Sequence, residues 1–203
     1  MNSYLTIKNK GLGEHQVKGS KYFGFAYPIV SANQVKFHLQ ELKKEFLDAS
    51  HICYAYRILN HNNIDDFSTD AGEPRGSAGL PMLNVLKSQK IINTVVYVIR
   101  YFGGSKLGIP GLIKSYSIAI ENTLKNSILI DYVPLITIDI SFEMKYNSRI
   151  EAIIHKYNGI AIHKDFFSDI IYSISLPEEK KNVFIDEVQN ITNGNIKIIK
   201  NSF

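Results

Sequence analysis

Two glycine-rich loops carry most of the residues of this sequence that could bind a ligand or do chemistry. The first runs from Gly72 to Gly79 and the second from Gly103 to Gly111, and together they hold seven of the 13 glycines. Glycine adopts positive φ readily and lets the backbone approach a ligand closely. In the second loop, successive backbone N–H groups could form a nest for an anion, and a helix starting there would add positive potential. A purely structural tight connection explains the same spacing equally well.

Basic and aromatic side chains surround the two loops. Lys106 lies within the second loop and Lys114 follows it, while Arg57 and Arg100 lie near the ends of expected strands, beside tyrosines. Basic residues interleaved with aromatics suit phosphate contact combined with base stacking. The alternative is that the aromatics are core residues and that the arginine stems lie along them. The candidate anion- or nucleic-acid-binding residues are Arg57, Arg100, Lys106, Lys114, Tyr54, Tyr56, Tyr101, Gly103, Gly104 and Gly108.

The first loop adds two carboxylates, Asp70 and Glu73. Such a pair could perform acid–base chemistry or hold Mg²⁺. More often these groups cap the next helix or pair with a nearby arginine. We therefore assign no catalytic residue, and the candidates in this loop are Asp70, Gly72, Glu73, Gly76, Ser77 and Gly79.

No cofactor and no metal site is predicted. His51 and Cys53 lie two residues apart on an expected strand, which could make half of a metal site or a Cys/His nucleophile pair. No second pair follows at metal-ligand spacing, and a lone buried cysteine is common. We therefore interpret both residues as structural.

Composition and charge narrow the class of protein. The chain of 203 residues is 45% hydrophobic and 21% charged, as expected for a globular protein. No apolar run approaches the ~20 residues of a membrane span. The N-terminus lacks the apolar segment of a secretory signal, and one cysteine cannot form an internal disulfide, so a cytoplasmic location is expected. Residues 1–125 hold 15 Lys/Arg and 9 Asp/Glu, which suits an anionic partner, although many proteins without one reach this excess.

The elements that must position these residues follow from the periodicity of the sequence. Residues 16–30 are expected to be extended, with a bulge at Gly24, and a capping box of Ser31 and Gln34 would open the next helix. Residues 60–78 are predicted to be a long polar loop, and such loops are usually functional or disordered. The other expected elements are strands at 51–59 and 94–102 and helices at 32–48, 80–89 and 111–125.

The last third of the chain predicts a second domain. Its pattern gives a strand, a helix, two strands, a helix and a strand, which is the βαββαβ order of the ferredoxin-like plan. The fold class is therefore α+β, with a boundary near residues 127–134 and domains at 1–127 and 134–203. The expected elements are strands at 135–145, 160–167, 170–176 and 196–199, with helices ending near Tyr157 and Thr192.

Three segments resemble the YigZ/IMPACT family: AYRI at 55–58, DAGEPRGSAGLPML at 70–83 and VIRYFGGSKLGIPGLIKSYS at 98–117. The combination of RYFGG with KLG is long and specific, and the resemblance covers residues 16–125. It implies an N-terminal α/β domain like a domain of a small-subunit ribosomal protein and of elongation factor G. The C-terminal βαββαβ segment is similar to the second domain of bacterial members, which resembles another domain of elongation factor G.

The sequence departs from the family pattern at four positions in the loops. Arg75 and Ser77 stand where a small residue and threonine are frequent, and both changes keep the loop polar. Family members often have two acidic residues before GEP, but here the second is Ala71, which weakens any mechanism that needs both carboxylates. Pro110 replaces a common glycine. The basic residues of the motif are intact as Arg100 and Lys106.

The resemblance and the charge together predict a non-enzymatic, cytoplasmic protein that associates with RNA or the ribosome and not with a membrane. A translation-related regulatory role fits the eukaryotic relatives, which act in translational control. The alternative is an enzyme that acts on a small phosphorylated or nucleotide ligand at the two glycine-rich loops.

Overall fold

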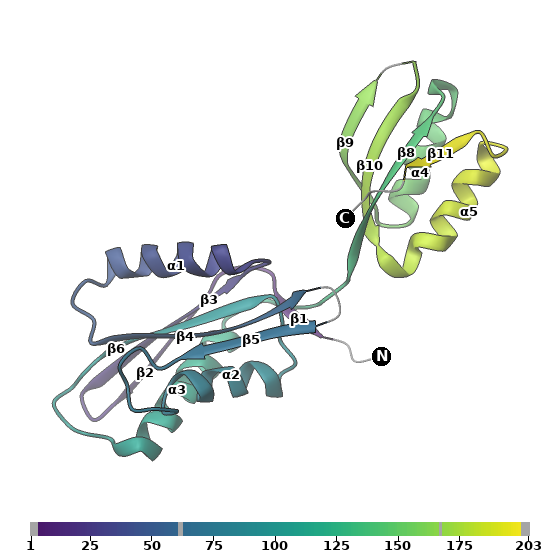
Figure 1. Cartoon of the computed structure of the whole chain (residues 1–203). Coiled ribbons are helices and arrows are strands. Elements are labelled where there is room, and N and C mark those ends of the chain that lie inside the picture. The colour runs from purple at the N-terminus through teal and green to yellow at the C-terminus, as the bar shows by residue number, and fades with distance from the viewer. Residues whose placement is uncertain (1–3, 61–62, 167, 200–203) are drawn as a thin grey trace. The chain divides into compact units, whose positions relative to one another are not determined.

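The computed structural model describes residues 4–60, 63–166 and 168–199 and shows a mixed α and β protein with three sheets (Figure 1). The chain divides into two compact units, Met1–Tyr132 and Val133–Phe203. Each unit has hydrophobic core clusters of its own.

A five-stranded antiparallel sheet forms the centre of the first unit, in the order β2-β3-β6-β4-β5. β6 lies in the middle and is buried from Thr94 to Arg100, as predicted for a central strand. A small separate sheet pairs β1 with β7. The strands are β1 (Leu5–Ile7), β2 (Gly11–Val17), β3 (Ser20–Pro28), β4 (His51–Asn60), β5 (Asn63–Thr69), β6 (Thr94–Tyr101) and β7 (Leu129–Asp131).

Helices cover the two faces of this sheet unequally: α1 (Ala32–Glu45) packs on one face, and α2 (Gly79–Ser88) and α3 (Gly108–Lys125) on the other (Figure 1). Because side chains alternate along a strand, β4 directs Tyr54 and Tyr56 to the α1 face and Cys53 to the α2 and α3 face. The single helix α1 leaves the β5 edge of its face partly open, where the Phe67 side chain is 41% exposed.

The predicted long loop at 60–78 is wrong, because residues 63–69 form the edge strand β5. Residues 61 and 62 lie outside the described residues. The polar sequence NIDDFST concealed this strand, since an edge strand with one open face needs few apolar residues. The loop between β5 and α2 is therefore shorter than predicted and runs only from Thr69 to Gly79.

The extended segment predicted at 16–30 is two strands rather than one. β2 and β3 form a hairpin that turns at Lys18 and Gly19, which have φ values of 46° and 78°. Gly24 is not a bulge, because β2 and β3 pair in continuous register past it. A Cβ at Gly24 would lie 2.0 Å from Oγ1 of Thr123, so the glycine is needed for close approach of α3 to the sheet.

The capping box predicted for α1 and the start predicted for α3 also differ from the structure, although α1 begins at Ala32 as expected. At α1, Ser31 makes no side-chain cap, and Oε1 of Gln34 accepts a hydrogen bond from the backbone N–H of Val30 at 2.7 Å instead. α3 begins at Gly108 rather than at residue 111, so Pro110 lies inside its first turn. Proline is tolerated there because its missing N–H would have no partner within the helix.

The second unit has the predicted βαββαβ order, with a four-stranded antiparallel sheet in the order β11-β8-β10-β9. Its two helices pack on one face of this sheet around a core that includes Phe142 and Phe184 (Figure 1). The strand predicted at 135–145 ends at Phe142, and residue 167 of the strand predicted at 160–167 lies outside the described residues. The elements are β8 (Leu135–Phe142), α4 (Asn147–Lys156), β9 (Ile160–Phe166), β10 (Ile170–Pro177), α5 (Lys181–Ile191) and β11 (Ile196–Ile199).

Gly24→Ala is expected to lower the free energy of unfolding by about 2–3 kcal/mol, because the added methyl group overpacks the contact between β3 and α3. Urea denaturation of the purified protein measures the change. Adding Thr123→Ala removes the nearest clashing atom, so the double variant should recover part of the loss. If both variants were as stable as the wild type, the close approach of α3 would not constrain this position.

Candidate functional site

The first glycine-rich loop is held by the carboxylate of Asp70. Its Oδ2 accepts a hydrogen bond from the N–H of Gly76 at 2.8 Å, and its Oδ1 accepts from Ala78 at 3.0 Å and Gly79 at 2.9 Å. Two of these donors lie at the start of α2, so Asp70 caps that helix from eight residues upstream. Burial raises the pKa of Asp70, but the three backbone donors outweigh it and hold the pKa below its ordinary value.

Glu73 of the same loop forms a buried ion pair with Arg100 at the end of β6. Oε1 of Glu73 lies 2.6 Å from Nη1 of Arg100, and the two side chains are 3% and 6% exposed. The same oxygen accepts a hydrogen bond from the hydroxyl of Tyr116 on α3 at 2.7 Å. One carboxylate therefore joins the first loop, the central strand and α3.

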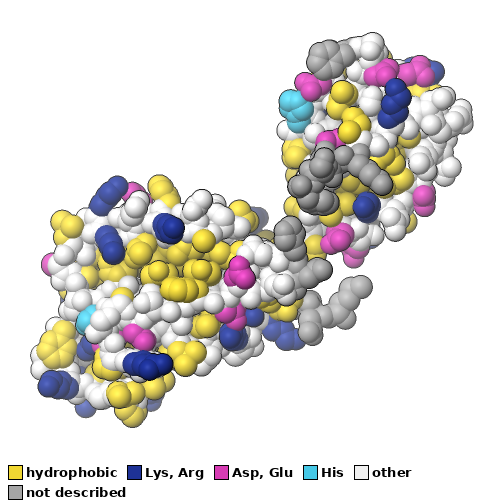
Figure 2. Space-filling model, viewed as in Figure 1, with side chains coloured by type: hydrophobic (Ala, Val, Ile, Leu, Met, Phe, Trp, Pro, Cys, Tyr) yellow, Lys and Arg dark blue, Asp and Glu magenta, His cyan; other side chains and the backbone are white. Residues whose placement is uncertain are grey.

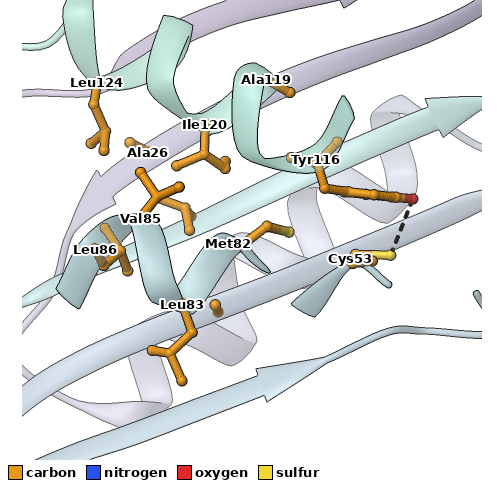
Figure 3. Packing of buried hydrophobic residues seen from close by; sticks show 14 of the residues in the cluster. Ala26, Cys53, Met82, Leu83, Val85, Leu86, Tyr116, Ala119, Ile120 and Leu124 are labelled. Carbon is orange, nitrogen blue, oxygen red and sulfur yellow. Dashed lines mark hydrogen bonds between the residues drawn. The ribbon is translucent and has the colours of Figure 1, made fainter. Parts of the chain in front are cut away.

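Cys53 lies against this network but is not a reactive thiol. Its Sγ donates to the carbonyl oxygen of Asp70 at 2.9 Å and lies 3.4 Å from the hydroxyl of Tyr116, the contact dashed in Figure 3. Burial raises the pKa of Cys53 to about 12, so the thiol stays protonated at neutral pH. Figure 3 shows the sulfur among the apolar side chains that α2 and α3 direct at the sheet.

These contacts favour the structural interpretation of the two carboxylates over acid–base chemistry. Asp70 is engaged as a cap, and Glu73 is buried and shared between Arg100 and Tyr116. Ser77 is also internal to the loop, since its hydroxyl donates to the carbonyl oxygen of Pro74 at 2.7 Å. Gly72 and Gly76 have φ of 90° and 75°, which L side chains rarely adopt, and Gly79 lies against the backbone of Thr69.

The structure does not leave Arg57 and Arg100 available to contact phosphate, which corrects the interpretation from sequence. Nε of Arg57 lies 2.9 Å from Oδ1 of Asp66, and its Nη1 donates to the carbonyl oxygen of Ile91 at 3.2 Å. Arg100 is held by Glu73. Both arginines lie on the face of the sheet that α2 and α3 cover. Arg57 is paired there with Asp66 and Arg100 with Glu73, and the sequence pattern had not identified these two pairs.

The second glycine-rich loop, by contrast, is fixed at its start and exposed beyond it. A Cβ at Gly103 would lie 1.9 Å from the carbonyl carbon of Gly19, and the Gly103 N–H donates to Oγ of Ser20 at 3.1 Å. Gly104 and Gly108 have φ of 84° and 69°. Lys106 in this loop and Lys114 on α3 are both exposed.

The N-terminus of α3 also differs from that of α2. Among the described residues, no side chain accepts a hydrogen bond from the first N–H groups of α3, whereas Asp70 occupies that position for α2. Unpaired N–H groups at the start of an 18-residue helix favour an anion. The two loops thus have different roles in the fold: the first is closed on itself and the second is open.

Both loops lie at the same end of the sheet. The N–H of Ser50 donates to the carbonyl oxygen of Arg100 at 2.9 Å, and Oγ of Ser50 accepts from the N–H of Phe102 at 3.2 Å. Nδ1 of His51 lies 3.0 Å from the carbonyl oxygen of Ala71. The start of β4 therefore lies between the first loop and the beginning of the second.

A groove of about 610 Å³ opens at this end, on the α1 face of the sheet. Its walls come from the second half of α1 and the turn after it, its floor from β4 and its far rim from Thr69 and Ala71. The lining residues are Leu39, Lys43, Phe46, Leu47, Ala49, Ser50, His51, Ile52, Tyr54, Thr69 and Ala71.

Beside the groove, three aromatic rings form a stack across β4 and β5. The ring of Phe67 lies 5.3 Å from that of Tyr56 at an interplanar angle of 16°, and 5.6 Å from that of Tyr54 at 27°. Tyr101, the remaining aromatic candidate, donates its hydroxyl to Oδ1 of Asp48 at 2.9 Å. Sequence reasoning missed Phe67 and Lys43. The period-two spacing of Tyr54 and Tyr56 could have indicated an aromatic partner on a neighbouring strand, had β5 been recognised.

The fold and the site define a two-unit α/β protein whose first unit joins two glycine-rich loops through a buried Glu–Arg pair. Residues 18–124, more than half of the chain, match the family described as the Impact N-terminal domain. The chain belongs to the YigZ/IMPACT family.

Individual relatives span nearly the whole chain. The Bacillus subtilis IMPACT family member YvyE is 28% identical over 96% of this chain and 89% of its own length. The Escherichia coli IMPACT family member YigZ is 25% identical over 91% of each. A solved structure described as a crystal structure of an hypothetical protein has a TM-score of 0.73 at 24% identity, covering 100% of this chain and 98% of its own, and it shares the fold.

Two further properties of the described residues bear on the site. Within residues 4–60, 63–166 and 168–199, no three His, Cys, Asp or Glu side chains gather closely enough to ligate a metal ion. In the same ranges, every helix is too short or too polar to cross a membrane.

Glu73→Gln is expected to lower the free energy of unfolding by about 3–5 kcal/mol, because it leaves the buried charge of Arg100 without its partner. Thermal and urea denaturation measure the loss. Glu121→Gln, at an exposed position on α3, is the matched control and should change stability by less than about 0.5 kcal/mol. Equal stability of the two variants would contradict the role of Glu73 in joining the loop to β6.

Asp70→Asn is expected to cost about 1–2 kcal/mol at pH 7, because the amide has one acceptor oxygen where the carboxylate has two. The folded-state pKa of Asp70 lies below the unfolded value of about 3.9. Its stabilisation is therefore present above that unfolded value and is lost as the pH falls through the folded-state pKa. Urea denaturation at several pH values should show a difference between variant and wild type that is full at pH 7 and smaller at pH 3. A difference independent of pH would argue against capping by the ionised carboxylate.

Proposed function

We propose that this chain is a non-enzymatic, cytoplasmic protein that associates with RNA or the ribosome and acts in translation-related regulation. The regulatory part rests on membership of the YigZ/IMPACT family and on the translational role expected from it. The association with RNA rests on the exposed loop between β6 and α3. That loop presents Lys106 beside helix N–H groups for which the described residues supply no side-chain acceptor, and Lys114 follows on the same helix.

The arrangement of charge supports phosphate as the ligand of this loop. Arg57 and Arg100 are neutralised inside the fold by Asp66 and Glu73, so the exposed lysines carry the attraction for a polyanion. A phosphate at the start of α3 would accept hydrogen bonds from backbone N–H groups and gain from the helix dipole. Gly104 and Gly108 leave the backbone accessible there, whereas Gly103 is packed against Gly19.

We further propose that the two compact units are two domains, at residues 1–127 and 134–203. The first would be of the ribosomal-protein and elongation-factor-G type, and the second ferredoxin-like. Supporting the second assignment are the βαββαβ order and the strand order β11-β8-β10-β9, in which β10 lies between β8 and β9. By the family resemblance, domains of both types occur in elongation factor G, in keeping with the proposed partner.

The combined variant Lys106→Gln/Lys114→Gln is expected to bind RNA more weakly and with a shallower dependence on salt. Each lost contact to single-stranded nucleic acid should reduce the slope of log K against log [salt] by about 0.7, so the pair should reduce it by about 1.4. Fluorescence anisotropy of a labelled single-stranded RNA, measured at salt concentrations from about 50 to about 200 mM, tests this.

Lys125→Gln, at the other end of α3, is the control for this experiment and should leave the slope unchanged. Co-sedimentation with ribosomes at micromolar protein concentration tests binding to the second proposed partner. The proposed function fails if wild-type protein shows no salt-sensitive binding to either RNA or ribosomes.

A further inference from the structure

We propose that the outer edge of β5 binds an extended basic peptide, which would pair with it as a sixth strand of the five-stranded sheet. The peptide would place a lysine or arginine opposite Asp65 and an apolar side chain opposite Phe67. This inference does not depend on the proposed association with RNA. It adds a surface for a protein partner that is distinct from the second glycine-rich loop.

The opposite edge of the same sheet is covered within the fold. β2 forms that edge, and the side-chain amides of α3 and of the residue at its C-terminal end lie along it. Nδ2 of Asn122 donates to the carbonyl oxygen of Glu14 at 2.9 Å. Nδ2 of Asn126 donates to the carbonyl oxygen of Leu12 at 3.0 Å. These outward carbonyl groups are therefore already engaged, and β2 offers a poor edge for another chain.

The other edge strands that the structure describes are protected in different ways. β9 has a bulge, marked by a register shift against β10 next to Ser173, and it carries Lys164. β11 has only four residues and carries Lys197, while β1 and β7 have three residues each. Bulges, short strands and edge lysines all hinder pairing with another chain.

β5 has none of these features. Its seven residues pair with β4 in continuous register and include no lysine and no proline. Among the described residues, no group is hydrogen-bonded to the backbone N–H and C=O groups on its outer side. Because alternate residues of an antiparallel strand direct both groups away from the partner strand, a free row of donors and acceptors remains. An extended chain is the ligand that pairs with such a row.

The charge of β5 favours a basic peptide over a second copy of this chain. The strand holds two acids and no base. Asp66 is paired with Arg57 and Lys87, whereas Asp65 is exposed, and the described residues supply only the neutral amide of Asn60 as its hydrogen-bond donor. Two β5 strands pairing about their middle would bring the acids of both copies together, which is unfavourable. A cation opposite Asp65 is favourable.

Phe67 supplies an apolar contact two residues from Asp65, on the same face of the sheet. Its ring is stacked on those of Tyr54 and Tyr56, yet the residue is 41% exposed. A side chain opposite Phe67 on the added strand would cover part of that area. Figure 2 shows acidic and apolar side chains next to one another on the near side of the first unit, where β5 runs in Figure 1. The edge therefore fits a peptide with a basic and an apolar side chain two residues apart.

The test is an NMR titration of isotope-labelled full-length protein with a heptapeptide of threonines that has leucine at its centre and lysine two residues to either side. Binding should shift the amide signals of β5. Alternate amides of β5, those that point outward, should exchange more slowly with solvent deuterium. The same peptide with every backbone nitrogen methylated keeps its charge but has no N–H to donate, and it should bind about tenfold more weakly or worse.

Matched variants separate the edge from general electrostatic attraction. Asp65→Lys should weaken peptide binding by about fivefold or more, because an attractive pair becomes a repulsive one. Asp65→Asn, which keeps the shape and removes the charge, should show a smaller loss. Glu14→Lys makes the same change of charge at an exposed position on β2 and should leave the affinity unchanged. The amide spectrum of each variant shows whether it is folded.

Three results would overturn the inference. One is equal binding of the methylated peptide, or an equal effect of Asp65→Lys and Glu14→Lys. Another is slow exchange of the outward β5 amides that develops with rising protein concentration and without peptide, because a second copy would then occupy the edge. The third is protection of the same amides by a single-stranded RNA hexamer. Lys106→Gln/Lys114→Gln should bind the peptide like the wild type, so failure of this inference leaves the proposed function standing.

Discussion

The ion pair between Glu73 and Arg100 is the contact on which the arrangement of the first unit depends. It is buried, and the Glu73 carboxylate is shared with the hydroxyl of Tyr116, so three segments far apart in the sequence meet at one oxygen. A charge pair of this kind adds little net stability compared with an apolar replacement, but leaving either charge alone is costly. Because an unpaired Arg100 would be costly, the pair favours closure of the first loop with Glu73 inside, facing Arg100.

Closing the first loop determines what the second can do. With Asp70 occupying the N-terminus of α2 and Glu73 neutralising Arg100, the carboxylates of the first loop are no longer available to cancel the charge of Lys106. The motif that spans both loops holds six Lys and Arg residues and two acids, and both acids are engaged inside the fold, so the charged side chains that the motif exposes are basic. The fold engages the acids of the motif in internal contacts and leaves its lysines exposed. The sequence alone does not show which charged residues become buried.

The sequence predicted the architecture well where periodicity was strong. The buried strand β6, the division of β4 into two faces and the βαββαβ order of the second unit all follow from apolar spacing. β5 was missed because an edge strand tolerates polar residues. That error hid Asp66, the partner of Arg57, and Phe67, the centre of the aromatic stack. Ion-pair partners and cross-strand stacks depend on register, which a single sequence specifies weakly at an edge.

The packing of Gly103 against Gly19 has a consequence for motion along the second loop. Gly103 has no room for a side chain, and its N–H is held by Oγ of Ser20, so its amide should exchange slowly with solvent deuterium. Gly104 has no neighbouring atom within 4 Å of a Cβ position, and Ser105 and Lys106 after it are exposed. Exchange should therefore rise sharply from Gly103 to Gly104, and motion of the loop would be confined between Gly103 and Leu107, which packs against the core.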